Sequence, residues 1–194
     1  MTKYPCKKGA MMSDKRTKAI EFATNAHKNQ RRKTTGEPYI VHPLAVMNIV
    51  CQYTDDEDVV CAAVLHDTIE DTPTSAEDIE KNFGEKIKNM VVQESEPDKN
   101  WSWGQRKQHT INRVACCNDR GCLLIACADK LDNLNCCLRE RNKTGDEVWT
   151  HFKRGFNEQK WYHTNLLRAF KKQMPECKMV ADYEVVVNEL FGKD

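Results

Sequence analysis

The apolar residues of this chain recur at the spacing of α-helices, and no segment of the sequence shows the alternation that predicts a β-strand. Near the start, Ser13 and Asp14 can cap a helix that runs to about Gln30, with Ile20 and Ala23 on its apolar face. Further helices are expected over residues 43–52, 59–67, 74–83, 104–117, 120–138, 158–173 and 177–190. These patterns predict an all-α fold.

The chain is long enough for one helical domain, and no sequence feature divides it. Its 194 residues contain no internal repeat and no linker-like stretch. We therefore expect a single domain over residues 1–194, with a motif-bearing core over about 15–138 and C-terminal helices over about 156–191. The acidic stretch 94–103, which contains a proline and two tryptophans, is expected to form an irregular loop that borders a site.

Charge and cysteine usage argue against several classes of protein. The 30 Lys and Arg residues nearly balance the 29 Asp and Glu residues, which argues against a nucleic-acid partner. No apolar run is long enough for a membrane span, and the first residues lack the apolar core of a secretory signal. The ten cysteines form no C-x-x-C pair, and we interpret them as free thiols in a reducing, cytoplasmic setting.

Four polar side chains lie where a metal site would explain them. His66 and Asp67 end one apolar run and Asp129 ends another, at positions where unpaired polar groups would be costly to bury. Together with His42 they provide two imidazole nitrogens and two carboxylates, a set that suits manganese, iron or zinc. Taken singly, each residue is more often a surface residue or a helix cap, so the surrounding motifs decide between the two interpretations.

Three segments carry a resemblance to a known family. Residues 31–43, 62–72 and 128–134 read RRKTTGEPYIVHP, AAVLHDTIEDT and ADKLDNL, and together they resemble the hydrolase domain of the RelA/SpoT family, within the HD superfamily. Enzymes of that family remove the 3′-pyrophosphate from the alarmone nucleotides (p)ppGpp. The resemblance spans about residues 20–135. It implies a single HD-domain helical bundle that acts on a small-molecule nucleotide.

The same resemblance implies roles for individual residues. The expected metal ligands, for Mn²⁺ or another divalent first-row metal, are His42, His66, Asp67 and Asp129. The residues expected to handle the attacking water are Glu70 and Asp71. The expected substrate contacts are Arg32, which would pack on the guanine, Lys33, Tyr39 and Asn133.

Helical spacing is consistent with the catalytic roles. Glu70 follows His66 by one turn and Asp71 follows Asp67 by one turn, so the four side chains share one side of a helix. Carboxylates one turn beyond a metal can position a water and accept its proton. Without the motifs, the two acids are equally well interpreted as a solvated helix end, and the basic run 28–33 as a solvated surface.

One segment departs from the family pattern and leaves the substrate open. Where the family continues with a Gly-Val-Thr-Lys-like stretch, this chain has QESEPDKN over residues 93–100, whose acidic charge would disfavour a nucleotide with two pyrophosphates. Three functions therefore stand: hydrolysis of (p)ppGpp, hydrolysis of another phosphorylated nucleotide or dinucleotide cofactor, and nucleotide binding without catalysis. Two further polar groups have two interpretations each: residues 106–109 form an exposed helix face or else face the phosphates, and residues 154–162 serve helix packing or else form part of a substrate wall, with the first interpretation preferred in both cases.

Overall fold

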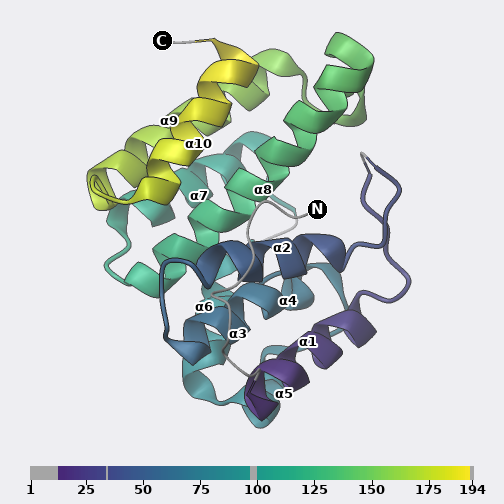
Figure 1. The fold of residues 1–194 in the computed structure, drawn as a ribbon, viewed down its shortest axis with the longest axis vertical. Coiled ribbons are helices and arrows are strands. Elements are labelled where there is room, and N and C mark those ends of the chain that lie inside the picture. The colour runs from purple at the N-terminus through teal and green to yellow at the C-terminus, as the bar shows by residue number, and fades with distance from the viewer. Residues whose placement is uncertain (1–12, 34, 97–99, 193–194) are drawn as a thin grey trace.

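The structure, a computed structural model, describes residues 13–33, 35–96 and 100–192, and these form helices joined by turns and loops (Figure 1). In chain order the helices are α1 (Asp14–Ala26), α2 (Val41–Val50), α3 (Glu57–Leu65), α4 (Thr68–Asp71), α5 (Ala76–Phe83), α6 (Glu85–Glu94), α7 (Trp103–Cys116), α8 (Arg120–Thr144), the 3-10 helix η1 (Gly145–His151), α9 (Phe156–Gln173) and α10 (Lys178–Phe191).

Helix α8 runs through the middle of the bundle (Figure 1), and most of its residues from Cys122 to Leu134 are buried. It contacts α2, α3, α6, α9, α10 and η1. Helix α3 is also covered on all sides, since every residue from Val59 to Leu65 is buried against α1, α2, α6 and α8. A helix that is apolar all round has to lie inside a bundle, as α3 does, and the buried part of α8 packs beside it in the core.

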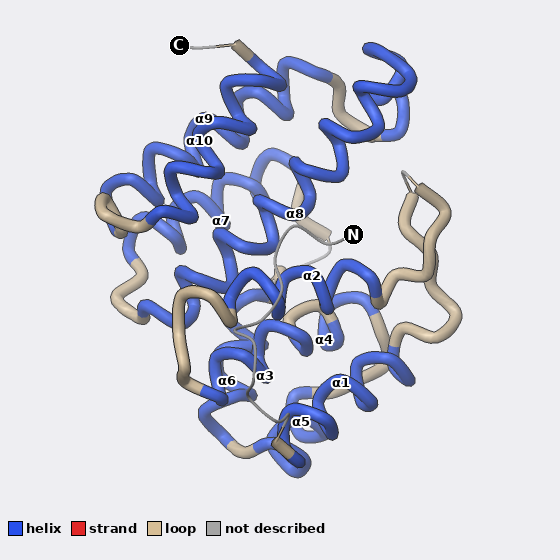
Figure 2. The backbone as a smooth tube through the Cα atoms, in the orientation of Figure 1, coloured by secondary structure: helices blue, strands red, loops and turns tan. Residues whose placement is uncertain are grey.

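The remaining helices cover these two from opposite sides. In Figure 1, α1, α2 and α6 pack against α3 in the lower half of the view, with α5 against α6, while α9 and α10 pack with α8 in the upper half and α7 packs against α9. Within the described ranges no segment forms a strand, and the isolated backbone bridge there joins Arg31 and Pro38 (Figure 2). The predicted all-α bundle is therefore confirmed. No described helix is long and apolar enough to cross a membrane.

Two helices, α1 and α8, end four or more residues from the predicted position. Helix α1 ends at Ala26 and not near Gln30, because the chain turns there, with the amide of Gln30 donating a 2.9 Å hydrogen bond to the carbonyl of His27. Helix α8 continues six residues beyond the predicted end at residue 138, to Thr144. It stops at Gly145, whose φ of 66° is a conformation that glycine adopts at little cost.

Helix α6 was not predicted, because it carries few buried residues: Ile87, Met90 and Val91. It is separated from α5 by Gly84, whose φ of 88° interrupts the helical path. The expected irregular segment lies between α6 and α7. Of the predicted stretch 94–103, Glu94 ends α6 and Trp103 begins α7, residues 95, 96 and 100–102 are non-helical, and residues 97–99 lie outside the described residues.

Gly121 allows α8 to approach α3 closely. A Cβ atom at this position would lie 2.7 Å from Cγ2 of Val59, which is too close for an ordinary contact. The two helices run in the same direction from this point: Asp129 lies eight residues beyond Gly121, and His66 lies seven residues beyond Val59. The close approach therefore helps to bring Oδ1 of Asp129 within 3.9 Å of Nε2 of His66.

Candidate active site

His42, His66 and Asp129 converge from three helices. His42 lies in the first turn of α2, His66 directly follows α3, and Asp129 lies in the middle of α8. All three are buried, and one donor atom of each lies within 4.8 Å of the donor atoms of the others. The packing of α2 and α3 against α8 thus assembles a group of side chains that can hold a metal ion.

Hydrogen bonds orient both imidazole rings toward the same point. Nδ1 of His66 lies 2.9 Å from the carbonyl oxygen of Ala63, and Nδ1 of His42 lies 2.7 Å from Oδ2 of Asp132. Both oxygens are acceptors, so both Nδ1 atoms carry the hydrogen and donate it. The lone pairs of the two Nε2 atoms are left for a metal, as in metal-binding histidines generally.

Asp67 adds a second carboxylate to this group. Its Oδ2 atom lies 3.0 Å from Nε2 of His66 and 3.6 Å from Nε2 of His42, while Oδ1 of Asp129 lies 3.2 Å from Nε2 of His42. Nε2 of His66 is buried, yet it makes no hydrogen bond with any described residue. A cation would satisfy such a buried nitrogen, and the mixed nitrogen and carboxylate donors fit a divalent first-row metal.

The charges of these groups depend on one another. Burial alone would lower the pKa of His66, but Asp67 and Asp129 outweigh that effect and raise the pKa to about 10. Burial would raise the pKa of Asp67, but His66 and His42 outweigh it and hold the pKa below its usual range. Both carboxylates are therefore ionised at neutral pH, and a metal would displace protons from the imidazoles on binding.

The two predicted catalytic acids line the same pocket as the metal-binding group. Glu70 lies in α4, and its Oε2 atom accepts a 3.0 Å hydrogen bond from the amide of Glu96. Burial raises the pKa of Glu70 above its ordinary value. Asp71 ends α4 and is exposed. A half-buried carboxylate with a raised pKa is suited to exchanging protons near neutral pH.

Two of the predicted substrate contacts, Tyr39 and Asn133, also line the pocket. The Tyr39 hydroxyl donates a 2.7 Å hydrogen bond to Oδ2 of Asp67. The Asn133 amide, one helical turn after Asp129, donates a 2.6 Å hydrogen bond to Oδ1 of that residue. Both side chains thus bind the carboxylates of the metal-binding group and present polar atoms to the same pocket.

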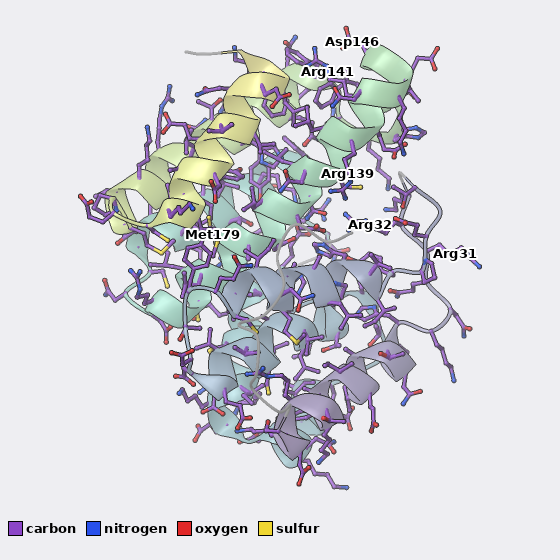
Figure 3. All side chains as sticks on the ribbon, viewed as in Figure 1. Arg31, Arg32, Arg139, Arg141, Asp146 and Met179 are labelled. Carbon is purple, nitrogen blue, oxygen red and sulfur yellow. The ribbon has the colours of Figure 1, made fainter. Side chains whose placement is uncertain are left out.

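Arg32 and Lys33 are placed differently. Arg32 points toward α8 (Figure 3), where Nη1 donates to Oδ2 of Asp132 and Nη2 to Oδ1 of Asn133, each at 2.9 Å. Lys33 is exposed, and neither residue is among the described residues that line the pocket. Arg32 is therefore not part of a solvated charge run, and its guanidinium is engaged by two residues of α8.

The comparison with known protein families agrees with this arrangement. A family model described as an HD domain matches residues 19–154, which is more than half of the chain. The chain belongs to the HD domain family.

Several relatives of this HD domain protein are named as guanosine-3′,5′-bis(diphosphate) 3′-pyrophosphohydrolases. The protein called guanosine-3′,5′-bis(diphosphate) 3′-pyrophosphohydrolase MESH1 in Xenopus tropicalis is 38% identical over 135 residues, which are 68% of this chain and 72% of that protein. Its counterpart in Drosophila melanogaster is 39% identical over 145 residues, 73% of this chain and 78% of that protein. A guanosine-3′,5′-bis(diphosphate) 3′-pyrophosphohydrolase of Aquifex aeolicus (strain VF5) is 37% identical over 118 residues, 60% of this chain, and the matched part is 17% of its length.

Two solved structures share the fold. A metazoan ortholog of SpoT, described as hydrolyzing ppGpp, has a TM-score of 0.80 at 25% identity, covering 95% of this chain and 100% of the other. A protein from Listeria monocytogenes EGD-e has a TM-score of 0.71 at 34% identity, covering 78% of this chain and 99% of the other. The resemblance that the motifs indicated is therefore confirmed.

The sequence analysis did not assign a role to every residue that supports or lines the pocket of this HD domain protein. Asp132, which orients His42, follows Asp129 by three residues on α8, and this helical spacing was the available signal. Lys107 lines the pocket, so the interpretation of residues 106–109 as an exposed face is wrong for it. In the stretch 154–162, Gln159 and Tyr162 are buried, as the predicted helix packing requires.

Proposed function

We propose that this protein is a metal-dependent phosphohydrolase that releases pyrophosphate from the 3′ position of (p)ppGpp. The observation that carries the proposal is the convergence of His42, His66, Asp67 and Asp129 beside Glu70 in one pocket. The names of the relatives from Xenopus tropicalis and Drosophila melanogaster, and the ppGpp hydrolysis ascribed to the metazoan structure, support this substrate.

We propose Mn²⁺, or another divalent first-row metal, as the ion that these four residues hold. A bound ion would supply Lewis-acid stabilisation to the phosphate oxygens that gain charge during the reaction. Once the imidazoles of His42 and His66 have lost their protons to bind the ion, the described lining has six carboxylates against three cationic side chains, Lys107, Arg113 and Lys130, and the ion offsets part of this difference. This excess of negative charge would otherwise repel a phosphorylated nucleotide.

Glu70 would take the proton of the attacking water. The water oxygen forms a bond to the phosphorus attached to O3′, the bond between that phosphorus and O3′ breaks, and O3′ takes up a proton. The products are pyrophosphate and a nucleotide with a free 3′-hydroxyl. The raised pKa of Glu70 suits this task, and Asp71 completes the acidic pair at the exposed edge of the pocket.

Tyr39 and Asn133 would contact the nucleotide while holding the carboxylates of Asp67 and Asp129. Arg32 would act in part through its hydrogen bond to Asn133, in addition to the packing on guanine that the motif implies. For the exposed Lys33 we propose contact with a part of the nucleotide that extends beyond the pocket. The free cysteines of the described residues suit the cytoplasmic location that we also propose.

Product analysis tests the proposal. Mn²⁺-loaded protein is incubated with ppGpp, with and without EDTA, and the products are separated by ion-exchange chromatography. We expect metal-dependent release of GDP and pyrophosphate, and its loss in an Asp129→Asn variant. A folded protein that holds the metal but releases neither product would overturn the substrate assignment.

One observation favours a second candidate, hydrolysis of a less highly charged phosphorylated nucleotide or dinucleotide cofactor. Glu94 and Glu96 already neutralise Arg113 and Lys107 on one wall of the pocket. Measuring phosphate and pyrophosphate release from a panel of nucleotides separates the two candidates. A higher kcat/KM for monophosphorylated substrates than for ppGpp would favour the second.

A further inference from the structure

Glu96 neutralises one cation of the pocket lining, Lys107, and one outside it, Arg106. Its Oε1 atom lies 2.9 Å from Nζ of Lys107, and its other oxygen pairs with Nη1 of Arg106. Burial would raise the pKa of Glu96, but Lys107 and Arg106 outweigh it and hold the pKa below its ordinary value. The side chain of Glu96 is 10% exposed, so this carboxylate is charged and shielded from bulk water.

The other cations of the described pocket lining are paired as well. Arg113 donates two hydrogen bonds, of 2.5 and 2.9 Å, to Glu94, whose side chain is 3% exposed. Lys130 pairs with Asp129, a proposed metal ligand. Lys107, with 22% of its side chain exposed, is more accessible than Arg113, with 14%. Lys107 is therefore the cation of this wall that an incoming anion can most readily reach.

We propose that Glu96 is a specificity-determining residue, which limits the phosphate charge that the pocket accepts by holding Lys107 and Arg106. This inference rests on the proposed function, because it concerns the same pocket and an anionic substrate. A phosphate group that reaches Lys107 has to displace a charged and mostly buried carboxylate, or else bind beside it. Each additional negative charge on the substrate increases that cost.

The backbone of Glu96 has a separate task. Its amide donates the hydrogen bond to Oε2 of Glu70, and a side-chain substitution leaves this amide in place. Replacing Glu96 by glutamine removes the charge but keeps the shape and the backbone contact. The charge of Glu96 also contributes to the raised pKa of Glu70, so the affinity for anions and the KM, and not kcat, are the quantities that report on this wall of the pocket.

Two measurements test the inference. The dissociation constant for inorganic pyrophosphate is measured by calorimetry on the Mn²⁺-loaded protein, and KM and kcat are measured with ppGpp. For Glu96→Gln we expect about fivefold tighter pyrophosphate binding and a KM lowered by a similar factor, since one charged hydrogen bond becomes available to phosphate. Glu80→Gln, on the exposed pair with Lys88 in another part of the bundle, makes the same change in net charge and should alter neither constant.

The conservative variant Glu96→Asp keeps the charge and should behave like the wild type. Equal effects of Glu96→Gln and Glu96→Asp would show a structural role and overturn the inference, and so would unchanged constants in Glu96→Gln. The double variant Glu96→Gln/Lys107→Gln should lose the gain in pyrophosphate affinity. Tighter pyrophosphate binding by Glu96→Gln in a protein that does not hydrolyse ppGpp would sustain this inference while the proposed substrate falls.

Discussion

The Oδ2 atom of Asp132 lies 2.7 Å from Nδ1 of His42 and accepts a second hydrogen bond, of 2.9 Å, from Nη1 of Arg32. Burial would raise the pKa of Asp132, but His42 and Arg32 outweigh it and hold the pKa below its ordinary value. The residue is therefore a charged acceptor. Such an acceptor holds the imidazole in place and makes its other nitrogen a better metal ligand.

Replacing Asp132 by asparagine should weaken metal binding. The amide oxygen can still accept from Nδ1 of His42, but the charge that supports the imidazole is lost, so we expect the affinity for Mn²⁺ to fall about 10- to 100-fold. Calorimetric titration of Mn²⁺ into the metal-free protein measures this. Asp146→Asn, at a carboxylate that is 81% exposed, is the matched control. Equal affinities of wild type and Asp132→Asn would mean that packing alone orients His42.

Glu70→Gln and Asp67→Ala should separate metal binding from turnover. Glu70→Gln should retain the metal and lower kcat about 10²- to 10⁴-fold, because the carboxylate that accepts the proton is gone. Asp67→Ala should lose both the metal and the activity, since it removes a carboxylate 3.0 Å from Nε2 of His66. Metal content by atomic absorption and turnover with ppGpp are measured on the same samples. Unchanged turnover in Glu70→Gln would remove that residue from the mechanism.

Gly121→Ala should destabilise the fold, whereas Gly104→Ala should not. A Cβ atom at residue 121 would meet Cγ2 of Val59 at 2.7 Å, and relieving such overpacking costs about 1–3 kcal/mol of unfolding free energy. A Cβ atom at residue 104, in the first turn of α7, meets no atom within 4 Å, and alanine there should stabilise by up to about 1 kcal/mol. Urea denaturation of the two variants checks this. If Gly121→Ala and Gly104→Ala unfold at the same urea concentration, α3 and α8 can move apart to accept the added methyl group without loss of stability.

His163 should make the fold less stable in mild acid. Burial, together with the charges of Lys130 and Lys107, lowers its pKa to about 3, and Nδ1 lies within hydrogen-bond distance of the Tyr183 hydroxyl, at 2.6 Å. An unfolded histidine titrates near pH 6.5, so between these two values the unfolded chain binds a proton that the folded chain does not. Stability from this residue is thus present above pH 6.5 and falls by about 2 kcal/mol on going to pH 5.

The variant His163→Gln tests this pH dependence, because glutamine can form the same hydrogen bond but does not titrate. Urea denaturation of both proteins at pH 7.5 and pH 5.0 gives the change in unfolding free energy. Other titrating groups are common to both proteins, so the difference between the two changes isolates His163. If the wild type loses no more stability than the variant, His163 is already protonated in the folded protein.

The helices and the proposed metal ligands could be derived from the sequence, because both depend on local patterns. Apolar residues at helical spacing predict helices wherever they are dense, as in α3 and α8, and fail where they are sparse, as in α6. His42, His66, Asp67 and Asp129 stood out because polar residues that end apolar runs need partners, and the family motifs surround them.

The tertiary structure alone decided which atoms meet. Arg32 and Asp132 are 100 residues apart in the chain, and their hydrogen bond changes the expected task of Arg32. The loop that contains Glu96 was expected to border a site, but its pairing with Lys107, from a helix face interpreted as solvated, was not. Such contacts depend on how helices that are distant in sequence pack against one another. That packing is set by the shape and volume of the whole core, which no local pattern of residues contains.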